Sequence, residues 1–196
     1  MIQSTRILIV DDELPPIMHD LRTMGFQLTH ISDLTPQSAE DVEKGRYDVV
    51  LLDFGGVGSR FGPDEGLAAL RHIRNINPAI IVISYTSRAL GAKHADFYTL
   101  ADRILDKDAG LTGTREIIVA AIRQSFTPDH LWDGVLAKLN ATHNAADKAQ
   151  WQHLFEGARR SEHGRQKLRN SVLARAASGP ARELLGRLLD RLFLAF

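Results

Sequence analysis

The sequence predicts an α/β fold, a doubly wound five-stranded parallel sheet with helices on both faces, followed by an all-helical module. Three observations lead to this prediction. Short β-rich runs alternate with longer helical patterns through residues 1–126. Several of the β-rich runs contain four or five successive apolar residues, which is typical of strands covered on both faces. After residue 126, the apolar residues recur only at helical spacing.

The elements of the first part can be placed in chain order. The expected strands are residues 6–11, 26–32, 47–53, 79–85 and 102–107. The expected helices are residues 15–24, 36–44, 64–76, 88–99 and 113–126. Connections between parallel strands are right-handed, and ligands of such sheets gather at the carboxyl ends of the strands. We therefore expect functional residues at that edge of the sheet.

A helix start marks the next boundary. Thr127 is a capping residue, Pro128 suits a first helical position, and Asp129 adds an acid to the first turn. We therefore expect two domains, residues 1–126 and 127–196. The helices expected in the second are residues 128–141, 145–162, a segment ending near 177, and a last leucine-rich helix after the turn at 178–180.

The composition excludes several classes of protein. The chain has no cysteine, so neither a disulfide scaffold nor a thiolate metal site is possible. The N-terminus lacks a signal-peptide pattern and no apolar stretch approaches the ~20 residues of a membrane span, so we expect a cytoplasmic protein. The net charge is zero. Residues 1–126 carry 13 Lys+Arg and 17 Asp+Glu, and residues 127–196 carry 11 and 7, an asymmetry too small to indicate nucleic acid.

Carboxylates follow two of the expected buried strands. Asp11 and Asp12 come directly after the apolar residues 7–10, and Asp53 ends the run of residues 47–52. Three carboxylates at neighbouring strand ends repel one another unless they share a cation. Hard oxygen ligands with open positions are what Mg²⁺ prefers. The sequence therefore predicts a magnesium site with one carboxylate left free for chemistry.

Two further strand ends supply a hydroxyl and a cation. Ser84 follows the apolar residues 80–83, and Lys107 follows residues 103–106. A carboxylate nucleophile, a metal, a hydroxyl and an ammonium group are the parts that phosphoryl transfer needs. This edge of the sheet is therefore predicted to be a phosphoryl-transfer site.

Residues 5–126 resemble the receiver domain of two-component response regulators, a flavodoxin-like fold, because these acids, the hydroxyl and the lysine occur in order, each after the right strand. The resemblance implies that Asp53 is the phospho-acceptor. It implies that Asp11, Asp12 and the Gly55 carbonyl hold Mg²⁺ together with Asp53.

The resemblance also implies roles for the remaining residues and for partners. Ser84 and Lys107 would bind the phosphoryl group, which a sensor histidine kinase or a phosphotransfer protein would donate. The protein would then be a phospho-acceptor and not an enzyme, apart from at most self-phosphorylation and dephosphorylation. The tail contains no second catalytic constellation.

Several positions depart from the family's pattern. The loop of residues 54–65 is about five residues longer than usual, and it is either a flexible lid or partner-recognition loop, or a tolerated surface insertion. Ile104 stands where the family has a switching aromatic. Asp108 replaces the usual proline after the lysine, so the family's local cis peptide is not expected. Tyr85 is bulky where a small residue is common, and it would narrow the path of water to the phosphoryl group. We expect switching through the loop or through Tyr85.

The last helix suggests what the tail does. It has one wide apolar face opposite a row of arginines, and such a stripe usually packs on another helix. We therefore expect a dimerisation or docking module, with a homodimer formed through the C-terminal helices. Binding to a membrane surface is an alternative for a basic amphipathic helix. The apolar face consists of Leu184, Leu185, Leu188, Leu189, Leu192 and Phe193.

Basic residues in the tail leave a second function open, that of a transcriptional regulator whose C-terminal helices bind DNA. A helix-turn-helix with its turn at Gly164 would bury Arg160 and Asn170, so that motif does not fit. A solvated helix face is the simpler interpretation of the basic cluster, although phosphates attract such clusters. The cluster consists of Arg159, Arg160, Arg165, Lys167, Arg169 and Arg175.

The histidines of the tail do not form a recognisable site. None stands in the sequence setting of a histidine phosphotransfer module, and no pair has the helical spacing and third ligand that a metal site needs. We expect ordinary surface or partly buried histidines. They are His130, His143, His153 and His163.

Overall fold

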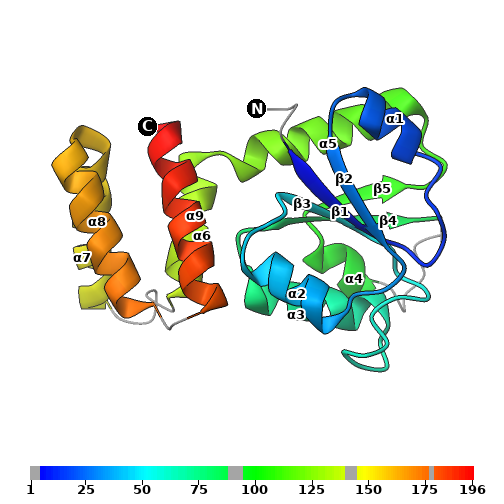
Figure 1. Cartoon of the computed structure of the whole chain (residues 1–196), viewed down its shortest axis with the longest axis horizontal. Coiled ribbons are helices and arrows are strands. Elements are labelled where there is room, and N and C mark those ends of the chain that lie inside the picture. Colours follow the sequence, from blue (N-terminus) through cyan, green and yellow to red (C-terminus); the bar gives the residue numbers. More distant parts are fainter. Residues whose placement is uncertain (1–4, 88–94, 140–144, 177–178) are drawn as a thin grey trace.

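The computed structural model confirms the predicted fold class (Figure 1). It describes residues 5–87, 95–139, 145–176 and 179–196. Five strands form one sheet in the order β2-β1-β3-β4-β5, and every pair of neighbours is parallel. The strands are β1 Arg6–Val10, β2 Gln27–Ile31, β3 Val49–Leu52, β4 Ile81–Thr86 and β5 Arg103–Asp106.

Helices cover both faces of this sheet (Figure 1). Residues of α1 and α5 pack on one face, and residues of α2, α3 and α4 pack on the other. The three central strands are buried on both faces, which is why their sequences are almost continuously apolar. The helices are α1 Met18–Thr23, α2 Pro36–Glu43, α3 Gly66–Ile76, α4 Ala95–Leu100 and α5 Leu111–Ser125.

Three helix starts differ from the sequence prediction: α1 begins three residues later, α3 begins two residues later at Gly66, and α5 begins two residues earlier at Leu111. α1 begins at Met18 and not at residue 15, and Pro16 disfavours the helical conformation at Pro15, the residue before it. The structure describes α4 from Ala95 onward. The first part of the helix predicted over 88–99, residues 88–94, lies outside the described residues.

The tail consists of further helices with a core of their own. Thr127 caps the first of them, accepting a hydrogen bond from the His130 N–H at 3.4 Å, as the sequence predicts. A single residue, Ser161, joins the third helix to the second, so these two form a tight antiparallel hairpin. None of the described helices is long and apolar enough to cross a membrane. The helices are α6 Pro128–Lys138, α7 Ala145–Arg160, α8 Glu162–Arg175 and α9 Pro180–Ala195.

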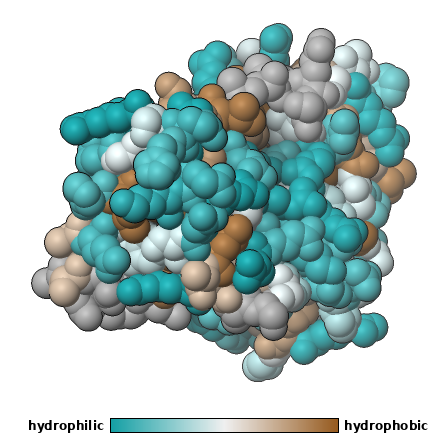
Figure 2. Space-filling model, turned by 60° about the vertical axis from the view of Figure 1, so that its left-hand side comes forward, coloured by the Kyte–Doolittle hydropathy of each residue, from teal (hydrophilic) through white to brown (hydrophobic). Residues whose placement is uncertain are grey.

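The apolar stripe of α9 is covered within the chain. Helix α9 packs against α6 and α8 (Figure 1). Its leucines belong to the core that these helices form with the rest of the tail. On the face that Figure 2 shows, hydrophilic residues predominate and hydrophobic ones occur only in small separate patches. The stripe therefore does not need a second molecule to bury it. Its buried leucines are Leu184, Leu185, Leu188, Leu189 and Leu192.

A buried group of charges joins the tail to the sheet. Asp48 lies directly before β3 and is only 4% exposed. Its carboxylate accepts hydrogen bonds from the Arg6 guanidinium at 3.0 and 3.3 Å and from Arg191 of α9. The Arg191 guanidinium also lies 5.3 Å from the centre of the Phe126 ring. Burial lowers the pKa of Arg191, while the Asp48 charge opposes this shift.

Helix α6 adds contacts at the same edge of the sheet. The Lys138 ammonium donates to the Ile76 carbonyl at 2.6 Å, and His130 Nε2 donates to the Ala79 carbonyl at 2.7 Å. Gly134 faces Ala79 so closely that a Cβ on the glycine would lie 2.4 Å from the alanine Cβ. The tail therefore packs tightly on the amino-terminal edge of the sheet, opposite the edge where the predicted acids lie.

Replacing Asp48 with asparagine should lower the free energy of unfolding by about 3 kcal/mol, because two partly buried guanidinium groups lose their counter-charge. Urea unfolding of the wild type and the variant measures this loss. The matched control is Glu40→Gln, which removes an ion pair with Lys44 on the surface of α2 and should leave the unfolding midpoint nearly unchanged. Equal midpoints for the two variants would contradict the importance of the buried charges.

Candidate functional site

The register of the sheet brings the predicted acids together at its carboxyl edge. Val10 of β1 pairs with Leu52 of β3, so the residues that follow them, Asp11 and Asp53, lie side by side. Both side chains project from the face of the sheet that α1 and α5 cover, by the alternation that places Ile9 and Leu51 in that core.

Lys107 lies between these two acids. Its Nζ atom is 2.7 Å from Asp11 Oδ2 and 3.0 Å from Asp53 Oδ2. Asp11 is 1% exposed and Asp53 is 7% exposed, so a single ammonium group offsets two nearly buried carboxylates. Burial lowers the pKa of Lys107, but hydrogen bonds and the charges of both acids outweigh it and raise the pKa above its usual value. Lys107 is therefore a permanent cation of this site.

Backbone groups and a histidine hold the two acids in place. Asp11 Oδ1 accepts a hydrogen bond from the Glu13 N–H at 3.1 Å, and the Asp11 carbonyl accepts one from His30 Nε2 at 2.9 Å. Asp53 Oδ1 accepts a hydrogen bond from the Phe54 N–H at 2.7 Å. The sequence prediction did not include His30. The sequence could have indicated His30, because it lies near the end of β2, the strand that pairs with β1.

The acids offer a suitable set of ligands for Mg²⁺. One carboxylate oxygen from each of Asp11, Asp12 and Asp53 lies within 4.8 Å of the others. Asp11 Oδ2 lies 2.7 Å from the Lys107 ammonium, and because a carboxylate oxygen can accept from more than one partner, it retains capacity for a cation. Asp12 is exposed, which leaves the solvent side open for water or a phosphoryl oxygen. Gly55 is buried close by, and the role of its carbonyl stays a prediction.

The structure directs the Ser84 hydroxyl to a backbone group and not to the acids. Ser84 is paired with Leu52 and shares its face of the sheet, the opposite face from Asp53. Its hydroxyl donates a hydrogen bond to the Arg103 carbonyl on β5 at 3.3 Å. Among the described residues, no side-chain hydrogen bond joins Ser84 to Asp53. Its predicted role in binding a phosphoryl group therefore stays a prediction.

Two departures noted in the sequence have structural counterparts. Ile104, at the position of the family's switching aromatic, is 46% exposed on the edge strand β5. No peptide bond between described residues is cis, which agrees with the aspartate that follows Lys107.

The long loop of residues 54–65 is anchored to the body of the protein. Val57 is completely buried in the core that α3 covers. The Gly58 N–H donates to Asp33 Oδ1 at 2.5 Å, which ties the loop to the end of β2. These contacts favour a packed insertion over a flexible lid.

The likeness of this chain to known proteins lies in its fold. No protein-family model matches the sequence, and no curated protein matches it. A CheY-like response regulator receiver domain protein from Methanospirillum hungatei is 21% identical, and the alignment covers 62% of this chain and 95% of that chain with a TM-score of 0.50. A two-component response regulator from Clostridium difficile is 18% identical, covering 61% and 97%, with a TM-score of 0.51. The chain therefore contains a receiver fold over about 60% of its length, and the C-terminal helices remain unassigned.

Replacing Gly56 with alanine should weaken Mg²⁺ binding roughly tenfold, a typical cost of disturbing the surroundings of a metal ligand. Gly56 has a φ of 74°, and a Cβ at this position would lie 2.3 Å from Asp12 Oδ2, so Asp12 must move. Calorimetric titration with Mg²⁺ measures the affinity. Gly113→Ala is the control, since nothing lies within 4 Å of a Cβ there. Equal affinities for the two variants would contradict a metal-ligand role for Asp12.

Ionisation of Tyr85 should occur about two pH units above that of an ordinary tyrosine. Burial raises the pKa of Tyr85 to about 12, with the Lys107 charge opposing the shift and the nearby acids adding to it. The folded state therefore holds the phenol proton more tightly than the unfolded state does. The resulting contribution to the free energy of unfolding is fully present below about pH 10 and is lost as the pH rises to about 12. The phenolate absorbance of the wild type minus that of Tyr85→Phe isolates this group. A midpoint near pH 10 would contradict the burial of the hydroxyl.

Proposed function

We propose that this protein is a response regulator in which Asp53 accepts a phosphoryl group with the help of Mg²⁺. The observation that carries the proposal is the Lys107 ammonium between the nearly buried carboxylates of Asp11 and Asp53, at the carboxyl edge of a sheet with the receiver fold. The donor is a sensor histidine kinase or a phosphotransfer protein. In this proposal the chain is a phospho-acceptor and not an enzyme that turns over an external substrate.

The transfer requires a nucleophile, a donor and charge compensation. An Asp53 oxygen attacks the phosphorus of a phosphohistidine, the O–P bond forms as the N–P bond breaks, and the imidazole nitrogen keeps the electron pair and takes up a proton. Lys107 already lies against Asp53 and offsets the negative charge that gathers there. Asp11, Asp12 and Asp53 would hold Mg²⁺, which when bound would supply positive charge to the phosphoryl oxygens.

The phosphoryl group changes the charge balance of the site. The acyl phosphate carries up to two negative charges in place of the single charge of the Asp53 carboxylate, and it adds three acceptor oxygens where Lys107 now holds two carboxylates. Binding these oxygens redistributes the three N–H donors of Lys107, which now face Asp11 and Asp53. We infer that this redistribution shifts the surrounding loops between two arrangements, which a partner then distinguishes.

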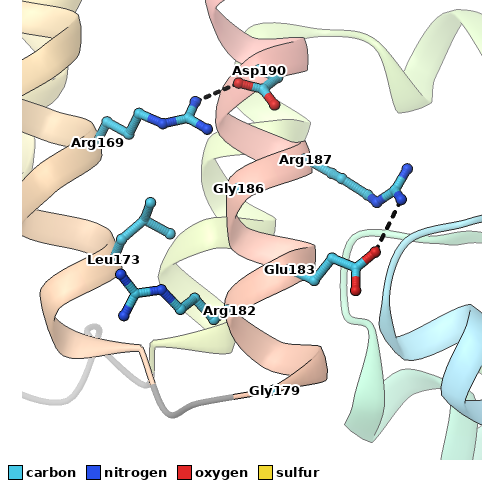
Figure 3. Close-up of a pocket in the computed structure, with 8 residues that line it drawn as sticks. All are labelled: Arg169, Leu173, Gly179, Arg182, Glu183, Gly186, Arg187 and Asp190. Atoms are coloured by element: carbon cyan, nitrogen blue, oxygen red, sulfur yellow. Dashed lines mark hydrogen bonds and ion pairs between the residues drawn. The ribbon is translucent and has the colours of Figure 1, made fainter.

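The tail is a helical output module in this proposal. Its predicted homodimer cannot use the apolar stripe of α9, because that stripe is buried within the chain. The DNA-binding alternative gains no support either, because acids offset part of the basic cluster. Figure 3 shows Arg169 of α8 paired with Asp190 of α9. Both residues line a groove of about 600 Å³. Arg165 lies 3.7 Å from Glu162.

The decisive experiment is phosphorylation of the full chain. Incubation with Mg²⁺ and a small phosphodonor such as acetyl phosphate should add one phosphoryl group to the wild type and none to Asp53→Asn, because the amide lacks the nucleophilic carboxylate. Intact-protein mass measures the gain. Light scattering with and without beryllofluoride then tests whether the modified state changes its assembly. A wild type that gains no phosphoryl group and does not bind beryllofluoride in the presence of Mg²⁺ refutes the proposal.

A further inference from the structure

Tyr85 is part of the site by its place in the sheet. Because Leu52 pairs with Ser84, the next residues along the two strands, Asp53 and Tyr85, are neighbours on the same face. Tyr85 is completely buried in the core beneath that face. The Lys107 ammonium lies over its ring, 5.4 Å from the ring centre. The ring of Tyr85 thus makes a cation–π contact with the ammonium group that pairs with Asp53.

The hydroxyl of Tyr85 has no hydrogen-bond partner among the described residues. An unpaired buried hydroxyl costs free energy that a phenylalanine ring in the same place would not cost. The hydroxyl of Tyr85 therefore does not stabilise the unmodified protein. We expect it to have a hydrogen-bond acceptor in another state of the site.

The surroundings of the hydroxyl indicate which acceptor that is. The charged groups that act on the phenol are Lys107, Asp11, Asp53 and Asp108. In the unmodified protein, the Lys107 ammonium already pairs with Oδ2 of Asp11 and with Oδ2 of Asp53. A phosphoryl group on Asp53 adds three strong acceptor oxygens on the neighbouring strand and on the same face of the sheet as Tyr85, whose hydroxyl is buried and unpaired.

We propose that the Tyr85 hydroxyl donates a hydrogen bond to a phosphoryl group carried by Asp53. The inference rests on the proposed function and deepens it, because it adds a phosphoryl-binding residue that is paired only in the modified state. Ser84 has its hydroxyl engaged with the Arg103 carbonyl from the opposite face, so the two hydroxyls are not equivalent in the unmodified protein.

The test compares Tyr85→Phe with the wild type in the full chain at saturating Mg²⁺. Beryllofluoride, which binds an aspartate as a phosphoryl mimic, is titrated into each protein and its affinity is measured by calorimetry. The variant should bind about tenfold more weakly, since a hydrogen bond to a charged acceptor is lost. The same variant without the mimic should melt at the same temperature as the wild type or higher, because an unpaired buried hydroxyl has been removed.

The matched control is Tyr47→Phe, a tyrosine packed on the other face of the sheet just before β3, which should keep the affinity of the wild type. Wild-type affinity in Tyr85→Phe overturns the inference. A lower melting temperature of Tyr85→Phe without the mimic also overturns it, because the hydroxyl would then have a partner in the unmodified state. A wild type that does not bind beryllofluoride overturns the proposed function itself, so the two failures are distinguishable.

Discussion

The site depends on one ion pair network, in which Lys107 holds two carboxylates that the sheet forces together. The parallel register of β1 and β3 leaves Asp11 and Asp53 no freedom to separate, and burial removes the water that would screen their repulsion. The compensating cation comes from the end of β5, beyond the intervening strand β4. Its side chain must cross β4, and the ring of Tyr85 forms the surface on which it lies.

The same electrostatic problem occurs at the other end of β3, with a different solution. Asp48 is nearly as buried as Asp11 and Asp53. Its charge is compensated by Arg6 from the sheet and by Arg191 from the tail. One edge of the sheet is thus closed by the C-terminal helices, while the other keeps Asp12 exposed. This division lets the tail stabilise the receiver fold without covering the site of the proposed phosphoryl transfer.

Much of the fold and of the site could be predicted because the signals are local. Strand ends, caps and prolines each depend on a few neighbouring residues, and they were sufficient to place Asp11, Asp53 and Lys107 at one edge. The partner of Arg191 could not be predicted, since 143 residues separate it from Asp48. A wide apolar stripe on α9 likewise does not say whether the chain itself or another molecule covers it.

The position of the tail restricts how a signal can leave Asp53. Ile104 offers no ring to move, and the tail contacts the edge of the sheet opposite the acids. Phe54 contacts the site, because its N–H donates to Asp53 Oδ1. Its ring packs edge-on against Phe97 of α4, with the two ring centres 5.2 Å apart. A phosphoryl group on Asp53 changes the acceptor of that N–H. We therefore expect the change to reach α4 first, and to reach the tail only through the sheet itself.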